Sequence, residues 1–369
     1  MLSKIEIHNF KIHKASELPL APLTIFSGIN GVGKSSVTQC LLLLRENITG
    51  NNYPGPLNIK GKSFDIGDSF ASLVNWHAED SDRLGISLHT DSNTYSFDYQ
   101  YTAENTTEIW PYPDSETYHP DELKDLALFN DNFQYLSAFR FGPLESHTGD
   151  TSAIKRRQVS IRNGNGEYAV AILDQYGNDE IEVLDMAEGS DTRLATQTAY
   201  WLSRISPNVR VAIDGNFSTK YHLNFTYPSS RGRHKVSPLN TGYGISYVLS
   251  VIVALLISPK GSLVVLENPE AHIHPAAQSA LMELVARAVK GGIQIIIESH
   301  SDHIIFGALV NMKKGLLKHD DVELLHFDID EKGQLTSDSV TIGPDCRIKN
   351  APAHFVEQMN IDLDVLFDE

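Results

Sequence analysis

The stretch Gly28-Ile29-Asn30-Gly31-Val32-Gly33-Lys34-Ser35 matches the pattern G-x-x-x-x-G-K-[ST] and decides the fold. The β-prone run Leu23-Thr24-Ile25-Phe26 precedes it, and a helical pattern follows it to about Glu46, as the motif requires. Its glycines allow successive backbone N–H groups to converge on phosphate oxygens at the positive end of a helix. The pattern therefore predicts a phosphate-binding loop between a strand and a helix.

The residue types within this loop predict separate roles. Lys34 is expected to reach the β- and γ-phosphates of ATP, and the Ser35 hydroxyl is expected to hold Mg²⁺. The loop residues expected to contact the nucleotide are Gly28, Asn30, Gly31, Gly33, Lys34, Ser35 and Ser36.

The composition is that of a globular protein with one large domain or two ordinary ones. Of its 369 residues, 41% are hydrophobic and 21% are charged, which excludes a disordered or fibrous chain. The longest apolar run, from Tyr247 to Ile257, is too short to span a bilayer, and the N-terminus has no apolar signal core. Cys40 and Cys346 fit no metal or disulfide spacing. We therefore expect a cytoplasmic protein without a membrane segment.

The net charge of −17 is unevenly distributed along the chain. The segment from His319 onward holds 13 Asp and Glu residues and 3 Lys and Arg residues, so it carries −10 of that charge. Two basic clusters are Lys155-Arg156-Arg157, with Arg162 nearby, and Arg231-Gly232-Arg233-His234-Lys235. An acidic chain does not coat DNA broadly, yet these clusters leave nucleic-acid binding by one face open. The alternative is that both clusters are solvated loops.

Hydrophobic periodicity predicts further helices and strands, without an internal repeat. Helices are expected over residues 121–130, 191–206, 244–257 and 275–289. Single strands are expected at the N-terminus and over residues 159–172, 181–184, 263–266 and 293–297. Pairs of strands are expected over residues 83–102, 210–227 and 324–342.

Two of these strands lead into residues that can complete a nucleotide site. The strand over residues 263–266 continues into Glu267-Asn268-Pro269-Glu270-Ala271-His272-Ile273-His274-Pro275. A carboxylate at such a strand end is suited to hold Mg²⁺ at the edge of the sheet. The strand over residues 293–297 continues into Glu298-Ser299-His300-Ser301. Zinc binding by His272 and His274 is disfavoured, because no further His or Cys stands at ligand spacing.

Together, the loop and these downstream runs resemble the nucleotide-binding heads of ABC and SMC-type ATPases. The run from Glu267 to Pro275 is similar to D-E-P-E-A-H-L-H-P in the ATPase half of OLD-family nucleases. Glu298-Ser299-His300-Ser301 resembles the T-T-H-S switch of that group, whose histidine senses the γ-phosphate. Asn240-Thr241-Gly242-Tyr243-Gly244-Ile245-Ser246 takes the place of the ABC signature. The resemblance is closest to small stand-alone bacterial ATPases, which often occur in anti-phage defence systems paired with an effector.

This resemblance implies an α/β fold of the ABC-ATPase head type. The expected architecture is a P-loop NTPase with a mixed or parallel sheet, flanking helices and an α+β insertion. The ATPase core is expected over residues 1–46 and 236–310, the insertion over 47–235, and an acidic tail with a β-hairpin over 311–369.

The resemblance also implies ATP and Mg²⁺ as cofactors. Mg²⁺ is expected on Ser35 and Glu267, and a catalytic γ-phosphate sensor in His300. Signature residues at a helix N-terminus can contact ATP held by a second protomer, so a homodimer or higher oligomer is expected. These signature residues are Gly242, Gly244 and Ser246.

One departure from the family pattern concerns hydrolysis. Asn268 occupies the position of the carboxylate that activates water in ABC ATPases, and an amide cannot accept a proton. Slow turnover is therefore expected unless Glu270 or Glu298 replaces that carboxylate. The alternative is that Asn268 is simply a turn residue before Pro269.

Two features outside the expected core have alternative interpretations. Tyr135-Leu136-Ser137-Ala138-Phe139-Arg140-Phe141-Gly142-Pro143 resembles a segment that lies near the nucleotide in the related ATPases. Arg140 either contacts phosphate or pairs structurally with an acid. Asp328-Ile329-Asp330 resembles the metal-binding pair of a Toprim nuclease, but it borders the tight turn Glu331-Lys332-Gly333, which disfavours a catalytic metal.

These observations favour an ATPase that turns over slowly, dimerises around ATP and regulates a partner effector in bacterial anti-phage defence. The effector could be a nuclease, a toxin or a component of a reverse-transcriptase system. The first alternative is a DNA-binding ATPase of the SMC and repair type that engages duplex through the basic clusters. The second is a binding module in which ATP is structural. A small-molecule kinase or GTPase would leave the Glu267–Pro275 run and His300 unexplained.

Overall fold

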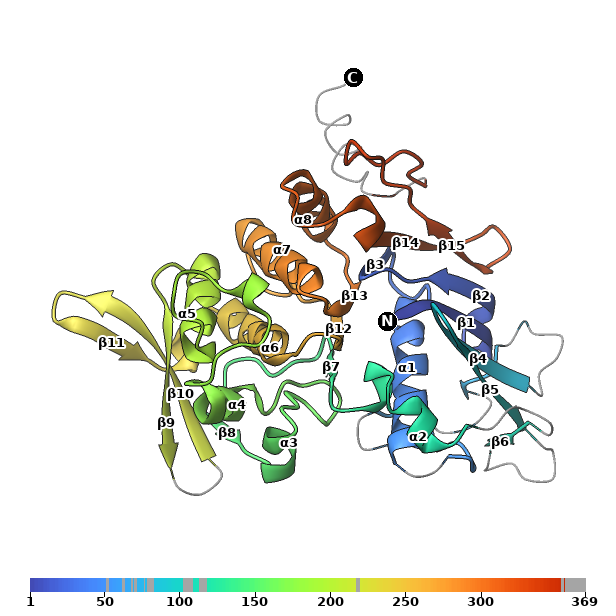
Figure 1. Cartoon of the computed structure of the whole chain (residues 1–369), viewed down its shortest axis with the longest axis horizontal. Coiled ribbons are helices and arrows are strands. Elements are labelled where there is room, and N and C mark those ends of the chain that lie inside the picture. Colours follow the sequence, from blue (N-terminus) through green and yellow to red (C-terminus); the bar gives the residue numbers. More distant parts are fainter. Residues whose placement is uncertain are drawn as a thin grey trace.

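The computed structural model describes residues 1–50, 53–61, 64–67, 69, 72–75, 77, 83–101, 109–112, 118–216, 220–352 and 355. A six-stranded sheet stands at the centre, with helices α4 to α8 on one side and helix α1 with a second sheet on the other (Figure 1). The phosphate-binding loop joins the central sheet to α1, so this sheet decides where the site lies.

Five parallel strands and one antiparallel edge strand form the central sheet. Strand β3, which leads into the phosphate-binding loop, lies between β14 and β13. The spatial order of the strands is β15 (Leu335–Ser339), β14 (Val322–Ile329), β3 (Leu23–Gly28), β13 (Gln294–Glu298), β12 (Leu263–Glu267) and β7 (Phe133–Leu136).

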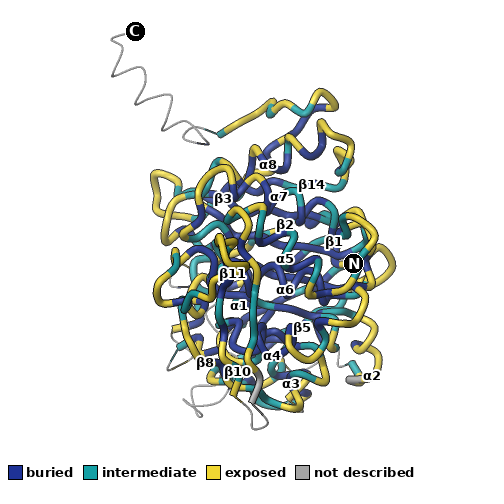
Figure 2. The backbone as a smooth tube through the Cα atoms, turned by 90° about the vertical axis from the view of Figure 1, so that its left-hand side faces the viewer, coloured by how far each residue is buried: buried dark blue, intermediate teal, exposed yellow. Residues whose placement is uncertain are grey.

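Apolar side chains cover both faces of the central sheet, as expected for parallel strands between two layers. Ile25 and Ile297 point into the core on the side of α4 to α8, whereas Phe26 and Ile296 point into the core under α1. Figure 2 shows these central elements as the buried part of the molecule. Burial on both faces fixes the strand register and thereby the positions of the polar residues at the strand ends.

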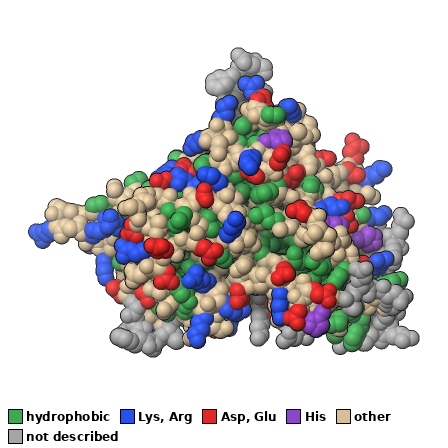
Figure 3. Space-filling model, viewed as in Figure 1, with side chains coloured by type: hydrophobic (Ala, Val, Ile, Leu, Met, Phe, Trp, Pro, Cys, Tyr) green, Lys and Arg blue, Asp and Glu red, His purple; other side chains and the backbone are tan. Residues whose placement is uncertain are grey.

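Two antiparallel sheets flank the central one. The sheet beside α1 has the order β2 (His13–Pro19), β1 (Leu2–Phe10), β4 (Arg83–Thr90), β5 (Thr94–Tyr101) and β6 (Ile109–Pro111). The sheet beyond α4 and α5 consists of β8 (Ser146–Thr148), β9 (Arg210–Asn216), β10 (Lys220–Ser229) and β11 (Gly232–Val236). The β10–β11 hairpin projects from the body, and Lys and Arg side chains gather near its tip (Figure 3).

Eight α-helices occur in the described part of the chain. They are α1 (Lys34–Thr49), α2 (Pro120–Leu123), α3 (Thr151–Lys155), α4 (Ala169–Tyr176), α5 (Leu194–Ile205), α6 (Tyr243–Ile257), α7 (Pro275–Lys290) and α8 (Asp302–Lys313). Short 3-10 helices cover Ala127–Phe129, Leu184–Met186, Pro238–Asn240 and His319–Asp321. None of the helices in this described part is long and apolar enough to cross a membrane.

Most of the expected elements are confirmed, but four expectations differ from the structure. The strand expected over residues 159–172 is wrong, because Ala169–Tyr176 is helix α4, whose first five residues are all buried. A short apolar run does not distinguish a buried helix from a buried strand. The strand expected over residues 181–184 gives way to the 3-10 helix Leu184–Met186, and the helix expected over residues 121–130 splits into α2 and the 3-10 helix Ala127–Phe129. The second basic cluster lies on strand β11 and not on a loop.

The central sheet takes strands from all three segments into which the sequence divides the chain. Strand β7 comes from the segment 47–235 and pairs in parallel with β12. Strand β14 comes from the segment 311–369 and pairs in parallel with β3. The division into core, insertion and tail stays a prediction, and most of the acidic stretch after Asn350 lies outside the described residues.

Candidate functional site

The phosphate-binding loop depends on glycine at two positions where the chain is crowded. Gly28 has φ +130°, and a Cβ there would lie 2.1 Å from the carbonyl oxygen of Phe327 on β14. Gly33 has φ +99°, and a Cβ there would lie 2.4 Å from Cγ2 of Ile12. Any larger residue would therefore meet both a strained backbone conformation and a clash.

Lys34 and Ser35 begin α1 and bring two polar groups to the mouth of the loop. The Lys34 ammonium donates hydrogen bonds to the carbonyl oxygens of Gly28 (2.9 Å) and Ile29 (2.6 Å), and burial lowers its pKa. The Ser35 hydroxyl donates to Oε1 of Glu298 at 2.8 Å. The loop is therefore tied directly to the end of β13.

Two carboxylates stand side by side where neighbouring parallel strands end. Glu267 closes β12 and Glu298 closes β13, and the two residues are in register. Glu267 accepts hydrogen bonds from the Tyr135 hydroxyl (3.1 Å) and the Ala138 backbone N–H (3.2 Å). Burial, followed by repulsion from Glu298, raises the pKa of Glu267 to about 7. The pair therefore favours a cation, which would relieve both the repulsion and the desolvation.

The residues at this edge fit Mg²⁺ bound together with a nucleotide. Oε2 of Glu298 is buried and has no hydrogen-bond partner, so it is free to take a ligand. Within the described ranges, no group of three His, Cys, Asp or Glu side chains could hold a metal alone. Mg²⁺ is typically bound by one or two carboxylates together with substrate phosphates. The expected pair of Ser35 and Glu267 stays a prediction, to which the geometry adds Glu298.

The raised pKa of Glu267 predicts a pH-dependent penalty on stability. The folded protein holds this proton to about pH 7, whereas the unfolded chain releases it near 4.5, so the free energy of unfolding falls between these pH values. We expect Glu267→Gln to raise the free energy of unfolding by about 1–3 kcal/mol at pH 8 without Mg²⁺, and by almost nothing at pH 4.5. Urea titrations at both pH values measure the difference.

Glu283→Gln is the matched control for that measurement. Hydrogen bonds from Arg204 and Arg287 outweigh the effect of burial and lower the pKa of Glu283. The same change should therefore destabilise the protein at pH 8, with the opposite sign to Glu267→Gln. Equal effects of both variants would contradict the assigned pKa of Glu267.

The turn after β12 places Asn268 and Glu270 beside the carboxylate pair. Asn268 has φ +43°, and its backbone N–H donates to the carbonyl oxygen of Glu298 at 2.8 Å. Oε1 of Glu270 accepts from the Ser299 hydroxyl (2.6 Å) and the His300 backbone N–H (3.3 Å). Its other oxygen, Oε2, is buried without a hydrogen-bond partner. Glu270 is thus held rigidly while one carboxylate oxygen stays available.

Arg140 has a structural position behind this turn. Its guanidinium is buried and donates to the carbonyl oxygens of Ser137 (2.6 Å), Glu267 (2.6 Å) and Asn268 (2.8 Å). Burial lowers its pKa to about 10. Neither of the two expected partners, a phosphate or a paired acid, accounts for these bonds, because the acceptors are backbone carbonyls. Arg140 therefore fixes the backbone that carries Glu267 and Asn268.

His300 lies between the phosphate-binding loop and the turn that holds Glu270. Burial and then the nearby charge of Lys34 lower its pKa, while a hydrogen bond with the backbone of Gly28 opposes this shift. The structure therefore brings the loop, Glu267, Glu270 and His300 to one edge of the sheet. Their roles stay predictions.

The signature-like segment at the start of α6 is only partly exposed. Gly242 caps the helix at the surface, whereas Gly244 and Ser246 are buried. A Cβ at Gly244 would lie 2.3 Å from the carbonyl oxygen of His272, so glycine lets α6 approach the turn after β12 closely. Gly242, with the exposed Tyr243, is therefore the part of this segment that a second copy could reach.

The structure also shows site residues that the sequence did not single out. His13 on β2 is fully buried, and its Nε2 lies 3.0 Å from the carbonyl oxygen of Gly33, so it supports the loop from behind. Burial lowers the pKa of His13 to about 4. Tyr135 and Ser299 orient Glu267 and Glu270. Tyr135 and Ser299 lie within runs already quoted from the sequence, although no role is assigned to them there, whereas no sequence signal points to His13.

Two disfavoured metal sites have other roles in the structure. The His272 ring packs 4.6 Å from the Tyr247 ring, and His274 caps α7 through its side chain. Asp330 accepts backbone N–H bonds from Lys332 and Gln334, both at 2.8 Å, which stabilise the turn between β14 and β15.

The fold and the site together define a P-loop NTPase of the ABC-ATPase head type. A phosphate-binding loop follows the first strand of a mixed sheet, and the acidic residues follow neighbouring parallel strands at the same edge. More narrowly, the chain belongs to the family described as "AAA domain, putative AbiEii toxin, Type IV TA system", which matches residues 23–305.

Solved structures confirm the predicted fold class. An SMC head bound to the C-winged helix domain of ScpA has a TM-score of 0.58 and 13% identity, and the match covers 92% of this chain and 98% of that one. An SMC head with an extended coiled coil, bound to the C-terminal domain of ScpA derived from Pyrococcus furiosus, has a TM-score of 0.56 and 12% identity, covering 100% and 99%. A comparison with curated protein sequences finds no match.

Proposed function

We propose that this protein binds ATP with Mg²⁺, hydrolyses it slowly, and dimerises around the bound nucleotide. The observation that supports the proposal most strongly is the contact of Ser35 with Glu298 beside Lys34 and Glu267. A lysine, a hydroxyl and carboxylates at a helix N-terminus are the groups that bind a triphosphate and its metal ion together.

Each residue of the site has a defined task in this proposal. Lys34 binds the terminal phosphates, and Ser35 with the two strand-end carboxylates holds the metal ion, which would supply charge neutralisation on the phosphates. Glu270 takes the proton of the attacking water through its unpartnered Oε2. His300 contacts the γ-phosphate. Slow turnover is expected because Asn268, the residue next to Glu267, offers an amide that cannot take a proton, which leaves this task to Glu270, two residues beyond the usual position of the base.

Two exposed aromatic side chains beside the site support dimerisation around it. Phe139 is 84% exposed and follows Ala138, whose N–H binds Glu267. Tyr243 is 63% exposed, and its ring lies 6.4 Å from that of His272, just after the Glu270 turn. Large apolar side chains this exposed are typical of interfaces, where aromatic residues act as anchors. Both aromatic residues lie next to segments that form the site, so a second copy that binds there would contact them.

Phe139→Asp is expected to prevent ATP-dependent dimerisation. A charge at an apolar anchor would weaken the dimer by about tenfold or more. Light scattering at micromolar concentration, with ATP and Mg²⁺, should give twice the monomer mass for the wild type and the monomer mass for Phe139→Asp. Leu184→Asp, at a residue that is 60% exposed in a different segment of the chain, should dimerise like the wild type. A wild-type protein that stays monomeric with ATP would contradict the dimer.

We propose further that the dimer regulates an effector, such as a nuclease or toxin, in bacterial anti-phage defence. The toxin–antitoxin wording of the family description and the ScpA-bound SMC heads support a partner protein. The product of a neighbouring gene should bind the wild-type protein with ATP and should not bind Lys34→Ala. Equal binding to both proteins would mean that effector binding does not depend on the nucleotide site.

A further inference from the structure

A second cavity lies at the C-terminal end of α1, away from the mouth of the phosphate-binding loop. This cavity, called the α1 cavity below, has a volume of about 800 Å³. Its walls come from α1, the segment 58–61, β7 and the segment 150–164. The volume lies within the range of small-molecule sites.

Positive charge dominates the walls of the α1 cavity. Four cationic side chains face two carboxylates and the last carbonyl groups of α1, which carry a partial negative charge. One carboxylate, Asp150, is engaged in capping α3, where it accepts from the Ala153 N–H at 2.8 Å. The cations are Arg45, Lys60, Arg156 and Arg162, and the second carboxylate is Glu46. In a chain with a net charge of −17, such a cavity favours an anionic ligand.

Arg45 is the innermost of these cations. Its guanidinium lies over the Phe133 ring, 4.7 Å from the ring centre, and donates to the carbonyl oxygens of Leu128 and Asn130. Burial lowers its pKa to about 10, the nearby charges of Asp131 and Glu46 oppose this shift, and the charge of Arg156 adds to it. Among the described residues, no carboxylate forms an ion pair with it. A buried cation without a direct counter-ion is a strong point of attraction for an anion.

The first basic cluster of the sequence separates into two roles here. Arg157 is structural, because it stacks on the Tyr176 ring at 4.9 Å and its carbonyl accepts from Gln134 at 2.7 Å. Arg156 and Arg162 instead line the α1 cavity and are exposed. The part of the cluster that can reach a ligand is therefore the pair Arg156 and Arg162.

One wall of the α1 cavity is shared with the ATP site. Tyr135 presents its aromatic ring to the cavity from β7, beside Phe133, whose ring is covered by Arg45. The Tyr135 hydroxyl donates to Glu267 at 3.1 Å, at the carboxyl edge of the same sheet. Gly164, also in the wall, packs so closely that a Cβ there would lie 2.7 Å from the Tyr135 ring. A ligand that displaces Tyr135 must therefore change the environment of Glu267.

We propose that the α1 cavity is a second ligand site, which binds a nucleotide through its phosphate and its flat base and is coupled to the ATP site through Tyr135. Arginines bind the phosphate, and the Tyr135 ring stacks with the base. The nucleotide is either free or the 5′-terminal residue of a single strand, since both offer the same chemistry. The coupling rests on the proposed ATP function, whereas the binding does not.

The binding test uses the full-length Lys34→Ala protein, so that the phosphate-binding loop cannot account for the result. The probe is pentathymidylate with a 5′-phosphate and a 3′-fluorescein, followed by fluorescence anisotropy. Changing Arg156 and Arg162 together to Glu should weaken probe binding by about tenfold or more. Arg231→Glu, at an exposed arginine on the projecting hairpin, should leave it unchanged. Because Arg156 and Arg162 are exposed, their replacement should not unfold the protein.

The outcomes separate the proposal from its alternatives. Displacement of the probe by thymidine monophosphate indicates a free nucleotide, and displacement only by a 5′-phosphorylated oligonucleotide indicates a strand end. The proposal is overturned if Lys34→Ala does not bind the probe, if removing the 5′-phosphate leaves affinity unchanged, or if the cavity variant binds like Arg231→Glu. None of these results depends on ATP hydrolysis, so they stand even if the proposed function fails.

The coupling has its own measurement in the wild-type protein. A saturating concentration of the displacing ligand should change ATP affinity by about fivefold or more, because linked sites alter each other's affinity reciprocally. Tyr135→Phe removes the hydroxyl that contacts Glu267 and should abolish this change while keeping probe affinity. An equal change of ATP affinity in both proteins would rule out the path through Tyr135.

Discussion

Glu270→Gln is expected to lower the single-turnover rate of ATP hydrolysis by about 10²- to 10⁴-fold, with little effect on ATP affinity. The reason lies in the two oxygens of the Glu270 carboxylate. Oε1 is fixed by Ser299 and His300, whereas Oε2 is buried and unpartnered. Gln keeps the shape of the side chain and can still accept both bonds, but it cannot accept a proton from water.

Two further variants distinguish this role from the others at the site. Glu298→Gln changes the carboxylate that contacts Ser35. It should raise the Mg²⁺ concentration needed for the half-maximal rate, and it should change the rate at saturating Mg²⁺ less. Asn268→Asp preserves the left-handed backbone at φ +43°, which Asp tolerates, and should speed turnover if the amide causes slow hydrolysis. A fast wild type that is indifferent to Glu270→Gln would contradict both the slow turnover and the role of Glu270.

The sequence predicts which residues lie at the carboxyl edge of the central sheet. It does not predict which of these residues contact one another. The loop motif and the apolar strands before Glu267 and Glu298 place their polar ends at one edge, because parallel strands share their carboxyl edge. Which carboxylate meets Ser35 depends on the strand order β3, β13, β12, in which β13 lies next to β3. Chain order gives no indication of that, so Glu298 was expected only as a substitute base.

Support from distant segments was also beyond the reach of the sequence. Tyr135 acts on Glu267 because β7 pairs with β12 over a long chain distance. His13 acts on the loop from β2, which pairs with its chain neighbour β1, so its contact with Gly33 comes from how that hairpin packs against the loop. Arg140 was singled out, yet its bonds to three backbone carbonyls depend on the exact path of the turn after β12. Local patterns do not specify such contacts.

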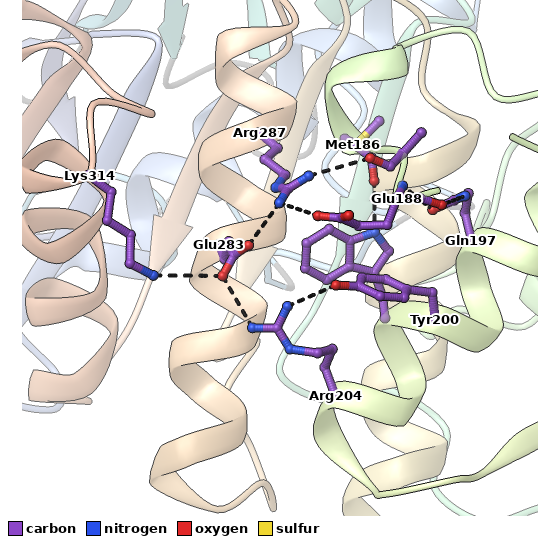
Figure 4. Close-up of polar contacts among 10 residues, drawn as sticks. Met186, Glu188, Gln197, Tyr200, Arg204, Glu283, Arg287 and Lys314 are labelled. Carbon is purple, nitrogen blue, oxygen red and sulfur yellow. Dashed lines mark hydrogen bonds and ion pairs between the residues drawn. The ribbon is translucent and has the colours of Figure 1, made fainter. Parts of the chain in front are cut away.

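The helix that leaves the turn after β12, α7, is held by a charged network around Glu283 (Figure 4). Glu283 of α7 accepts from Arg204 of α5 (3.2 Å) and from Arg287 (3.0 Å), and it lies 3.8 Å from Lys314 after α8. Beneath them, Trp201 of α5 is 1% exposed. The network joins α7, which follows the turn that holds Glu270, to α5 and to the end of α8.

Trp201→Ala is expected to lower the free energy of unfolding by about 3–5 kcal/mol, as is typical for a large buried aromatic residue. Its indole N–H donates to the carbonyl oxygen of Met186 at 2.9 Å, and the guanidinium groups of Arg287 and Arg204 lie 5.4 Å and 5.8 Å from its ring. Alanine would leave a cavity, an unpaired carbonyl and two cations without their aromatic partner. Urea titration followed by circular dichroism measures the loss.

Trp110→Ala is the matched control, because it removes the same side chain from β6, where it is 42% exposed, and should cost less than about 1 kcal/mol. Trp201→Phe separates the contribution of aromatic packing from that of the hydrogen bond. Phe keeps an aromatic face for Arg287 and loses the bond to Met186. If packing dominates, Phe should recover more than half of the stability lost in Ala. Equal losses in Trp201→Ala and Trp110→Ala would contradict the role of Trp201 in stabilising the contact of α5 with α7.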